Sequence, residues 1–299
     1  MAKLPWMFAS GVTLHVLPKW NAADVLRLTA QYRMTSLNGG AAHAALLLRH
    51  PDLDAYDLLS VRTIVAGSAA STPALINEAR ERLGCAYSVR YSLTESGGVG
   101  LATGIDADDD ELFHTVGRPR PGVEAKVVAD GVDAPDGEPG ELWLRAGSVM
   151  SEYWRDPAAT AETLVDGWLR TGDIAVRDEL GRFRLVGRAK EMFIRGGYNV
   201  YPLEVEAQLS AHPKVAQVAI VPRPDPVMGE IGVAVVVPRD PGDPPTLDEL
   251  RAHCESGLAR YKQPEALRVV DQLPMTAAEK LDRRALAEHE LVESSLDRA

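Results

Sequence analysis

The chain has 299 residues, of which 45% are hydrophobic and 25% charged, and its formal net charge is −11. These values are typical of a soluble globular protein with one large and one small domain. The negative charge argues against non-specific nucleic-acid binding, which needs a basic surface, although a phosphate ligand can still bind locally.

Features that would place the chain outside the cytoplasm are missing from the sequence. Cys85 and Cys254 are far apart and have no metal-binding spacing, so we interpret both as apolar residues of a reduced, cytoplasmic protein. The first residues lack a basic segment followed by a long apolar run, which argues against a signal peptide. No apolar stretch approaches the ~20 residues that a membrane span needs.

The first part of the chain, residues 1–112, alternates between strand and helix patterns, which favours a parallel α/β sheet covered by helices. Ligands bind beyond the carboxyl ends of the strands in such sheets. Gly39-Gly40, Gly67-Ser68 and Tyr91-Ser92 fall at those ends. Strands are predicted at 12–17, 34–38, 61–66 and 86–91, and helices after Asn21 (with Val25, Leu28 and Tyr32 on one face), at 41–49 and at 72–83.

Two further parts are predicted. Residues 113–187 consist of short alternating runs separated by turns, which indicates antiparallel strands in a small β-barrel or a curved sheet. Residues 188–299 form a compact α+β domain that begins at Arg188 to Lys190. It contains a helix at 202–211, strands at 214–222 and 231–239, a helix with Leu247, Leu250, Cys254 and Leu258 on one side, a strand at 266–271, and a last helix from about Arg283.

The segment 167–206 carries the most specific chemistry. It contains Thr171-Gly172-Asp173, then Gly187-Arg188-Ala189-Lys190-Glu191, then Gly196-Gly197. The Asp173 carboxylate can accept two hydroxyl protons, as a ribose diol requires. The planar guanidinium of Arg188 suits phosphate or ribose oxygens. Gly196-Gly197 lets the backbone approach a ligand closely, because neither residue has a Cβ.

This ordered combination resembles the adenylate-forming (AMP-binding) superfamily, and in particular its acyl-CoA synthetase and fatty-acid–CoA ligase branch. The resemblance runs from about Ser10 onward but covers only the later part of the family. It implies ATP-dependent activation of a carboxylic acid to an acyl-adenylate, followed by transfer to coenzyme A. It also implies ATP/AMP, Mg²⁺ and coenzyme A as cofactors, and a mobile C-terminal domain.

The resemblance implies roles for residues of the large domain. Tyr91-Ser92-Leu93-Thr94-Glu95 is similar to the family's Tyr-Gly-x-Thr-Glu, with Ser92 in place of the glycine. Tyr91 would pack on the adenine, Thr94 would bond the α-phosphate and Glu95 would hold Mg²⁺. Gly67, Ser68 and Ala69 occupy the segment that runs along the adenine and the acyl pocket, with a tight strand–helix turn as the equal alternative. Asp173 would bind the ribose, and Arg188 the ribose or a phosphate; the alternative for Arg188 is a surface arginine.

Residues of the C-terminal domain also match family positions. Lys190 matches the hinge, with a solvated linker lysine as the alternative, and Gly196, Gly197 and Tyr198 would line the pantetheine tunnel. Residues 273–280 resemble the family's Leu-Pro-x-Thr-x-x-Gly-Lys, which makes Lys280 the catalytic lysine that bridges carboxylate and phosphates; a surface lysine is the alternative. Glu279 replaces the glycine and could restrict the loop, pair with Lys280 or raise its pKa. Residues 261–264 match Tyr-Lys-x-Pro, with a structural turn equally compatible.

One expected element is missing from this sequence: the Ser/Thr/Gly-rich loop ending in Lys-Gly that wraps the β- and γ-phosphates. Residues 96–100 are glycine-rich but lack the lysine. We therefore expect a fragment, a split enzyme with a separate N-terminal half, or a degenerate paralogue, whose first sheet has an unpaired edge or an uncovered face. The function alternatives are a non-catalytic binding or assembly protein and an aryl-CoA ligase. The expected partners are a carboxylic acid, a CoA or carrier-protein thiol, and a separate N-terminal half or a second copy.

Overall fold

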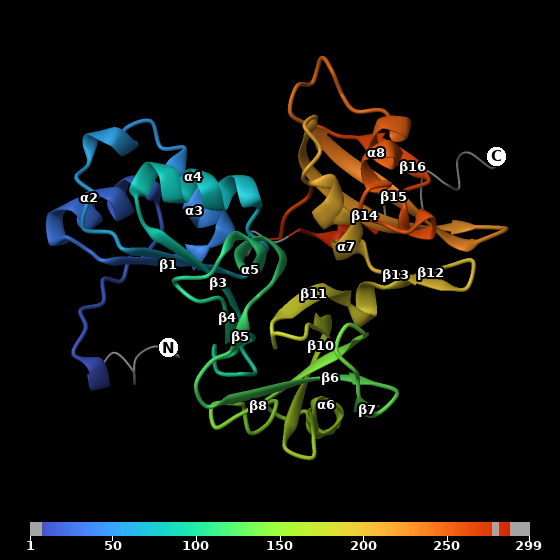
Figure 1. Cartoon of the computed structure of the whole chain (residues 1–299), viewed down its shortest axis with the longest axis horizontal. Coiled ribbons are helices and arrows are strands. Elements are labelled where there is room, and N and C mark those ends of the chain that lie inside the picture. Colours follow the sequence, from blue (N-terminus) through green and yellow to red (C-terminus); the bar gives the residue numbers. More distant parts are fainter. Residues whose placement is uncertain (1–7, 277–280, 288–299) are drawn as a thin grey trace. The chain divides into compact units, whose positions relative to one another are not determined.

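The computed structural model describes residues 8–276 and 281–287 (Figure 1). The chain folds into two compact units, Met1–Leu185 and Val186–Ala299, which we call the first and second unit. Each has its own sheets and its own hydrophobic core. Within the described ranges, every helix is too short or too polar to cross a lipid bilayer.

The first unit begins with a sheet whose leading three strands are parallel, which confirms the predicted α/β pattern. These strands are β1 (Ser36–Gly40), β2 (Thr63–Gly67) and β3 (Ala86–Tyr91), and β4 (Leu101–Ala102) and β5 (Arg118–Pro119) extend the sheet in antiparallel fashion. The helices around it are α2 (Ala22–Tyr32), α3 (Ala41–Leu48), α4 (Pro73–Leu83) and α5 (Asp109–His114), with a 3₁₀ turn η1 (Leu53–Ala55). Figure 1 shows α3 and α4 side by side along this sheet.

The core of this sheet lies on one face. Alternate strand residues Leu37, Ile64 and Tyr87 are buried against the helices, because successive side chains of a strand point to opposite faces. On the other face, Ser36 and Asn38 of β1 are exposed. β1 is also an edge strand. The described sheet thus has the unpaired edge and the partly uncovered face that the sequence predicts.

The N-terminal segment corrects one prediction. Residues 12–17 do not form a strand, and Val16 is 77% exposed. An alternating pattern becomes a strand only when its backbone groups pair with another strand. The following helix does begin at the predicted cap, where Asn21 accepts the Asp24 N–H at 2.8 Å. However, α2 buries Leu26 and Thr29, while Tyr32 is exposed.

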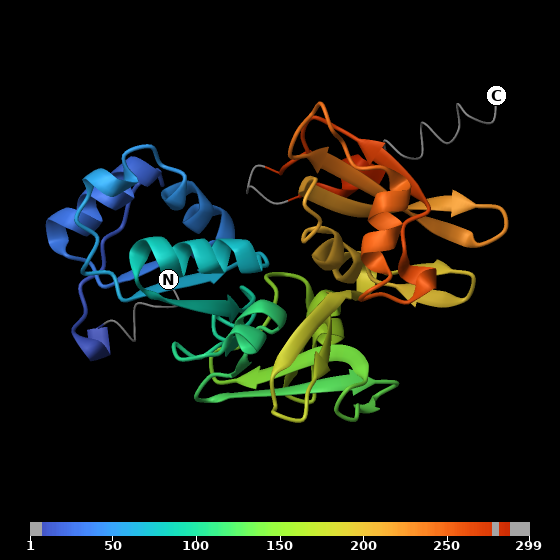
Figure 2. The same cartoon turned by 45° about the horizontal axis from the view of Figure 1, so that its top comes forward.

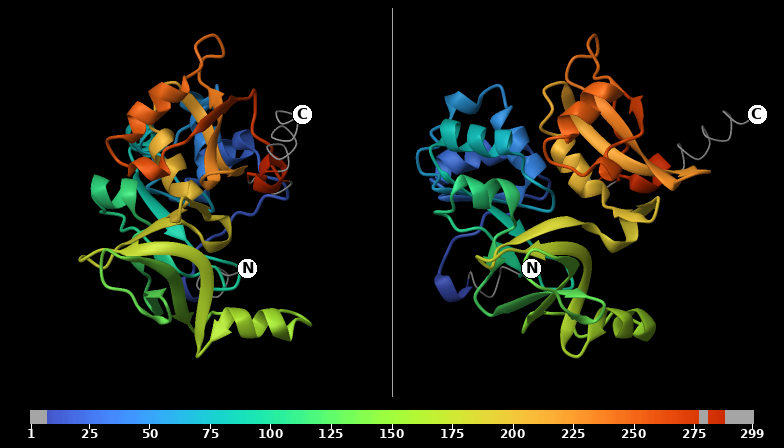
Figure 3. Two further views of the ribbon diagram at one scale, coloured as in Figure 1. Left: turned by 90° about the vertical axis from the view of Figure 1, so that its right-hand side faces the viewer. Right: turned by 45° about the vertical axis from the view of Figure 1, so that its right-hand side comes forward.

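The rest of the first unit is an open sheet in the order β11-β10-β8-β6-β7, with β9 beside β10. Of the two predicted forms, a small barrel or a curved sheet, the barrel is not closed, because in the described strands the two end strands β11 and β7 do not pair with each other. The strands are β6 (Val123–Ala129), β7 (Val132–Asp133), β8 (Pro139–Ala146), β9 (Leu164–Val165), β10 (Trp168–Arg177) and β11 (Phe183–Arg188). Helix α6 (Pro157–Thr163) projects beside β9 and β10, as the left view of Figure 3 shows.

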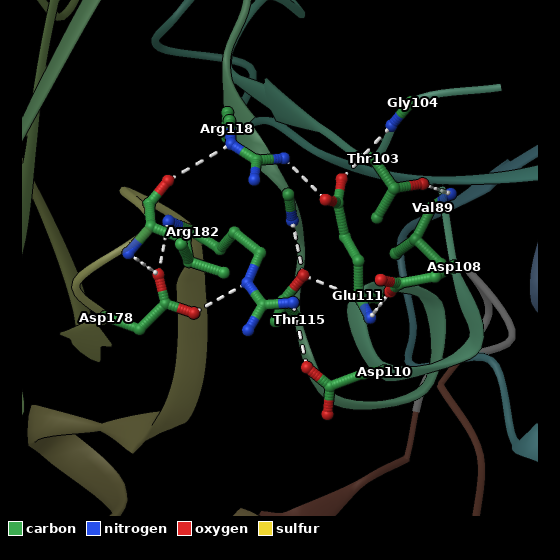
Figure 4. Close-up of polar contacts among 12 residues, drawn as sticks. Val89, Thr103, Gly104, Asp108, Asp110, Glu111, Thr115, Arg118, Asp178 and Arg182 are labelled. Carbon is green, nitrogen blue, oxygen red and sulfur yellow. Dashed lines mark hydrogen bonds and ion pairs between the residues drawn. The ribbon is translucent and has the colours of Figure 1, made fainter. Parts of the chain in front are cut away.

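A network of charged side chains joins α5 to the turn between β10 and β11 (Figure 4). Arg182 binds Asp110 at 2.8 Å and Asp178 at 2.6 Å. Arg118 pairs with Glu111, which is only 6% exposed. A buried carboxylate needs such a partner, since an unpaired one would be costly to desolvate. The network therefore attaches the first sheet of this unit to the second.

The second unit contains one mixed sheet in the order β13-β12-β15-β14, with β16 parallel to β15. The strands are β12 (Phe193–Arg195), β13 (Tyr198–Val200), β14 (Val215–Asp225), β15 (Gly229–Pro238) and β16 (Ala266–Val269). The helices are α7 (Pro202–Leu209), α8 (Leu247–Cys254) and residues 283–287, with 3₁₀ turns η2 (Ala189–Glu191) and η3 (Arg260–Lys262). Figure 2 shows α7 and α8 over one face of the sheet.

Both faces of this sheet are buried, which explains the continuous apolar run in β15. Ala234 and Val236 pack with α7 and α8, and Val233 and Val235 pack on the opposite side with Leu273, Leu281 and Leu286. A strand that is covered on both faces has no polar side, so it reads as unbroken rather than alternating. The predicted α+β organisation of this part is confirmed.

Candidate functional site

The predicted ribose ligand Asp173 lies in a β-bulge of β10. The register between β10 and β8 shifts between Arg170 and Ile174, and Gly172 has a φ of 71°. Such bulges bend a strand and redirect its side chains. The Asp173 N–H donates to Thr171 Oγ1 at 3.1 Å, and that hydroxyl donates to the Leu142 carbonyl at 2.7 Å. The bulge thereby holds Asp173 with 5% of its surface exposed.

The structure brings Asp173 together with Tyr91, the predicted adenine-packing residue at the end of β3. Tyr91 Oη donates to Asp173 Oδ2 at 2.5 Å, although the two residues are 82 positions apart. A carboxylate has about four lone-pair sites, so Oδ2 can accept from Tyr91 and still accept a ribose hydroxyl. The contact orients the carboxylate of Asp173.

The loop after β3 carries the other two predicted residues, Thr94 and Glu95. Thr94 is exposed and Glu95 is half-buried. Glu95 Oε1 accepts a hydrogen bond from Tyr153 Oη at 2.9 Å, and the Glu95 carbonyl accepts the Met150 N–H at 2.7 Å. The sequence reasoning missed Tyr153. Its only signal was a tyrosine shortly before a helix, which by itself does not indicate a contact 58 positions away.

Glu95 also bears on whether Mg²⁺ fits. No group of three or more His, Cys, Asp or Glu side chains that could hold a metal occurs in the part of the chain that the structure describes. Mg²⁺ often keeps several waters and binds through one or two carboxylates together with substrate phosphates. A single carboxylate at Glu95 therefore suits a metal that enters with a nucleotide.

Gly67, Ser68 and Ala69 lie where β2 ends. A Cβ on Gly67 would stand 2.8 Å from the Arg90 carbonyl oxygen, so the neighbouring strand requires glycine there. Ser68 has a φ of 66°, an uncommon conformation for a residue with a side chain. Ser68 and Ala69 are exposed. The close approach of the neighbouring strand explains why a glycine stands at position 67. The positive φ of Ser68 is a strained backbone conformation, and such strain is often found at functional sites.

In the second unit, Gly196 and Gly197 form the two-residue turn of the β12–β13 hairpin. Their φ values of 56° and 87° are those of a type I′ turn, which strongly prefers glycine. Tyr198 stacks on Tyr261 with the ring centroids 4.7 Å apart. The hairpin turn is therefore enough to explain both glycines. Their role beside the pantetheine arm stays a prediction.

The other predicted residues of this unit lie near η2 and the end of the chain. Arg188 and Lys190 are exposed, Lys190 within η2. Lys262, from the Tyr-Lys-x-Pro segment, places its Nζ 2.7 Å from both carboxylate oxygens of Glu204. Glu279 and Lys280 lie outside the described residues.

The segment after Lys280 is attached to the core of the second unit. Met275 and Leu281 form an antiparallel bridge. Arg283 makes two bonds to Glu206, at 2.8 and 2.7 Å, and a third to Glu191 at 3.0 Å. Glu206 is 8% exposed. The network links the predicted hinge region, α7 and the segment that follows the predicted catalytic lysine.

Comparison with known proteins identifies the family. The pattern of the AMP-binding enzymes matches residues 1–154, and that of the AMP-binding enzyme C-terminal domain matches residues 204–280. The chain is 34% identical over 283 residues to the medium/long-chain-fatty-acid–CoA ligase FadD8 of Mycobacterium tuberculosis, covering 92% of this chain and 50% of that protein.

Two solved structures are similar. The amide bond synthetase McbA of Marinactinospora thermotolerans is 36% identical with a TM-score of 0.84, over 91% of this chain and 55% of that one. The o-succinylbenzoate CoA synthetase of Bacillus subtilis, in complex with its acyl-adenylate intermediate, is 29% identical with a TM-score of 0.82, over 95% and 58%. The chain spans about half the length of the curated relatives it matches. With its sequence matched in two successive segments and its fold shared with these enzymes, the chain belongs to the family of AMP-binding enzymes.

Proposed function

We propose that this chain belongs to an enzyme that activates a carboxylic acid with ATP to an acyl-adenylate and transfers the acyl group to the thiol of coenzyme A. The observation that carries the proposal is the buried Asp173 carboxylate, aligned by the hydroxyl of Tyr91. A fatty acid is the proposed substrate, in keeping with the fatty-acid–CoA ligase among the relatives. An aryl acid is the second candidate, which the similarity to o-succinylbenzoate CoA synthetase favours.

The first unit would bind the nucleotide. Asp173 accepts hydrogen bonds from the ribose hydroxyls, the ring of Tyr91 packs on the adenine, and Thr94 donates to the α-phosphate. The turn formed by Gly67, Ser68 and Ala69 runs beside the adenine. Because Asp173 is already aligned in the protein, less ordering is needed when the nucleotide binds.

Glu95 would hold Mg²⁺ in company with phosphate oxygens. The metal, when bound, neutralises negative charge on the phosphates. The protein's contribution is one oriented carboxylate, since the Tyr153 hydroxyl and the Met150 N–H hold Glu95 at its side chain and its backbone.

The second unit would supply the groups that act on the reacting atoms. Lys280 brings an ammonium to the carboxylate and the phosphates as charge develops in the adenylation step. Arg188 contacts ribose or phosphate oxygens, and Lys190 is the hinge about which this unit turns between the two half-reactions. Gly196, Gly197 and Tyr198 line the path of the pantetheine arm.

Calorimetry with AMP, a stable acyl-adenylate analogue and ATP tests the nucleotide site. We expect residues 1–299 to bind AMP and the analogue. ATP should bind more weakly than AMP, since the sequence offers no loop for its β- and γ-phosphates. Two or three lost charge-assisted hydrogen bonds, each of about 1.5–3 kcal/mol, would remove productive ATP binding. Failure to bind AMP would refute the proposal.

Acid-dependent ATP–pyrophosphate exchange tests the reaction. We expect little exchange from residues 1–299 alone, and recovery in a longer form that contains a phosphate-binding loop. A panel of fatty and aryl acids in that form identifies the substrate class. A folded longer form that binds AMP but exchanges with no acid would instead support the non-catalytic alternative.

A further inference from the structure

Tyr153 occupies a fixed place between β8 and α6. Its backbone N–H donates to Thr160 Oγ1 at 2.9 Å, and Asp156 caps the same helix by accepting the Ala159 N–H at 2.9 Å. These contacts hold the backbone of Tyr153 at the start of α6.

The phenol of Tyr153 donates a hydrogen bond to Glu95. Oη lies 2.9 Å from Glu95 Oε1. The phenol is the donor of this pair, because an ionised carboxylate can only accept a hydrogen bond. A charge-assisted hydrogen bond of this kind is stronger than a neutral one and fixes the plane of the carboxylate.

The backbone of the Glu95 loop is held by separate contacts. The Met150 N–H donates to the Glu95 carbonyl at 2.7 Å, and Ser148 Oγ donates to the Ser96 carbonyl at 2.8 Å. At Gly97, whose φ is 68°, a Cβ would stand 2.5 Å from the Ser148 carbonyl oxygen. Loss of the Tyr153 hydroxyl would leave these contacts in place and free only the carboxylate.

We propose that Tyr153 is a positioning residue that presents Glu95 to a divalent metal ion through one oxygen. The inference rests on the proposed function. The phenol competes for Oε1, so Oε2 would be the more available metal ligand, and binding through one oxygen would suit the small Mg²⁺. Ca²⁺ is larger and also accepts a carboxylate through both oxygens. Tyr153 thereby favours Mg²⁺ over Ca²⁺.

The test uses Mn²⁺, which takes oxygen ligands as Mg²⁺ does, as a paramagnetic probe. Water-proton relaxation is measured on residues 1–299 at saturating AMP, and Mg²⁺ and Ca²⁺ then compete with Mn²⁺. We expect Tyr153→Phe to weaken AMP-dependent Mn²⁺ binding roughly ten- to a hundredfold, the scale of one charged hydrogen bond. It should also narrow the preference for Mg²⁺ over Ca²⁺, while the metal-free Kd for AMP stays the same.

Three variants separate positioning from general structure. Tyr32→Phe, at an exposed tyrosine of α2, should change neither ligand's affinity. Tyr91→Phe should weaken AMP but not Mn²⁺ at saturating AMP, because its hydroxyl binds Asp173 and not Glu95. Glu95→Gln should abolish AMP-dependent Mn²⁺ binding, and adding Tyr153→Phe to it should have no further effect.

Several outcomes would overturn the inference. Unchanged Mn²⁺ affinity in folded Tyr153→Phe would exclude positioning, and an equal loss of metal-free AMP affinity would indicate a general structural role. Wild-type protein that binds AMP without AMP-dependent Mn²⁺ binding would remove Glu95 and Tyr153 from the metal site, yet leave the nucleotide site standing. Wild-type protein that does not bind AMP would refute the proposed function together with this inference.

Discussion

The two units hold their predicted site residues in opposite ways. In the first, Asp173 is buried, and both Asp173 and Glu95 receive a tyrosine hydroxyl from a distant part of the chain. In the second, Arg188 at the end of β11, Lys190 on the short 3₁₀ turn η2 and Tyr198 beside a hairpin turn are exposed. A nucleotide site benefits from groups that are aligned before binding. Groups that act in different steps of a reaction must stay accessible. The difference in exposure therefore agrees with the proposal that the first unit binds the nucleotide and the second unit supplies groups for successive steps.

The largest expected effect is a loss of stability when the buried ion pair between Arg283 and Glu206 in the second unit is broken. Arg283→Ala would leave Glu206 buried without its partner, and breaking a buried ion pair in this way costs about 3–5 kcal/mol. Urea unfolding should show this loss. The double variant Arg283→Met with Glu206→Leu should recover much of the stability, because an apolar pair needs no charge partner. A single variant as stable as the wild type would show that the network does not support this unit.

Lys280 tests the chemical half of the comparison. In a catalytically complete form, Lys280→Ala should slow adenylation roughly 10²-fold or more, the scale of one preorganised electrostatic group. Thioester formation from supplied acyl-adenylate should change much less, since we propose that this unit turns between the two half-reactions. The two half-reactions are measured separately by single-turnover kinetics. An equal loss in both would contradict the assigned role.

A substitution at Asp173 tests whether the aligned groups of the first unit bind the nucleotide. Asp173→Ala removes the acceptors for the ribose diol, and charged hydrogen bonds contribute about 1.5–3 kcal/mol, so AMP affinity should fall roughly ten- to a hundredfold. Calorimetry measures this change. Asp133→Ala, at an exposed aspartate of the same sheet, is the matched control. Unchanged AMP binding in the first variant would exclude Asp173 from the site.

The smallest effect concerns pH. Burial, and then the charge of His253, lower the pKa of His212 in the second unit, and His212 Nδ1 accepts the Lys214 N–H at 3.2 Å. Folding thus favours the neutral imidazole. The corresponding part of the free energy of unfolding is complete above the unfolded pKa of about 6.5 and is lost as the pH falls below it. Urea unfolding at pH 7.5 and 5.5 should show a smaller pH dependence for His212→Gln, and an equal dependence would contradict this origin.

Much of the fold follows from local patterns in the sequence. The alternation of strands and helices predicts the parallel pairing of β1, β2 and β3, and Asn21 predicts the start of α2. For Gly196-Gly197 the sequence predicted a close approach to a ligand, and the structure adds a local reason, a hairpin turn in which both residues have a positive φ. Such features depend on neighbouring residues alone, so a pattern of a few positions is enough to predict them.

Only the tertiary structure decided the features that depend on distant partners. The pattern at 12–17 resembles a strand but is unpaired in the described chain, and the sheet of β6 to β11 is open because its end strands do not meet. The contacts of Tyr91 with Asp173 and of Tyr153 with Glu95 join residues 82 and 58 positions apart. Motifs in the sequence singled out the carboxylates of Asp173 and Glu95, whereas the tyrosine hydroxyls that bond them came together only when separate strands and loops packed. A hydrogen bond depends on distance in space, which residue spacing along a chain does not specify.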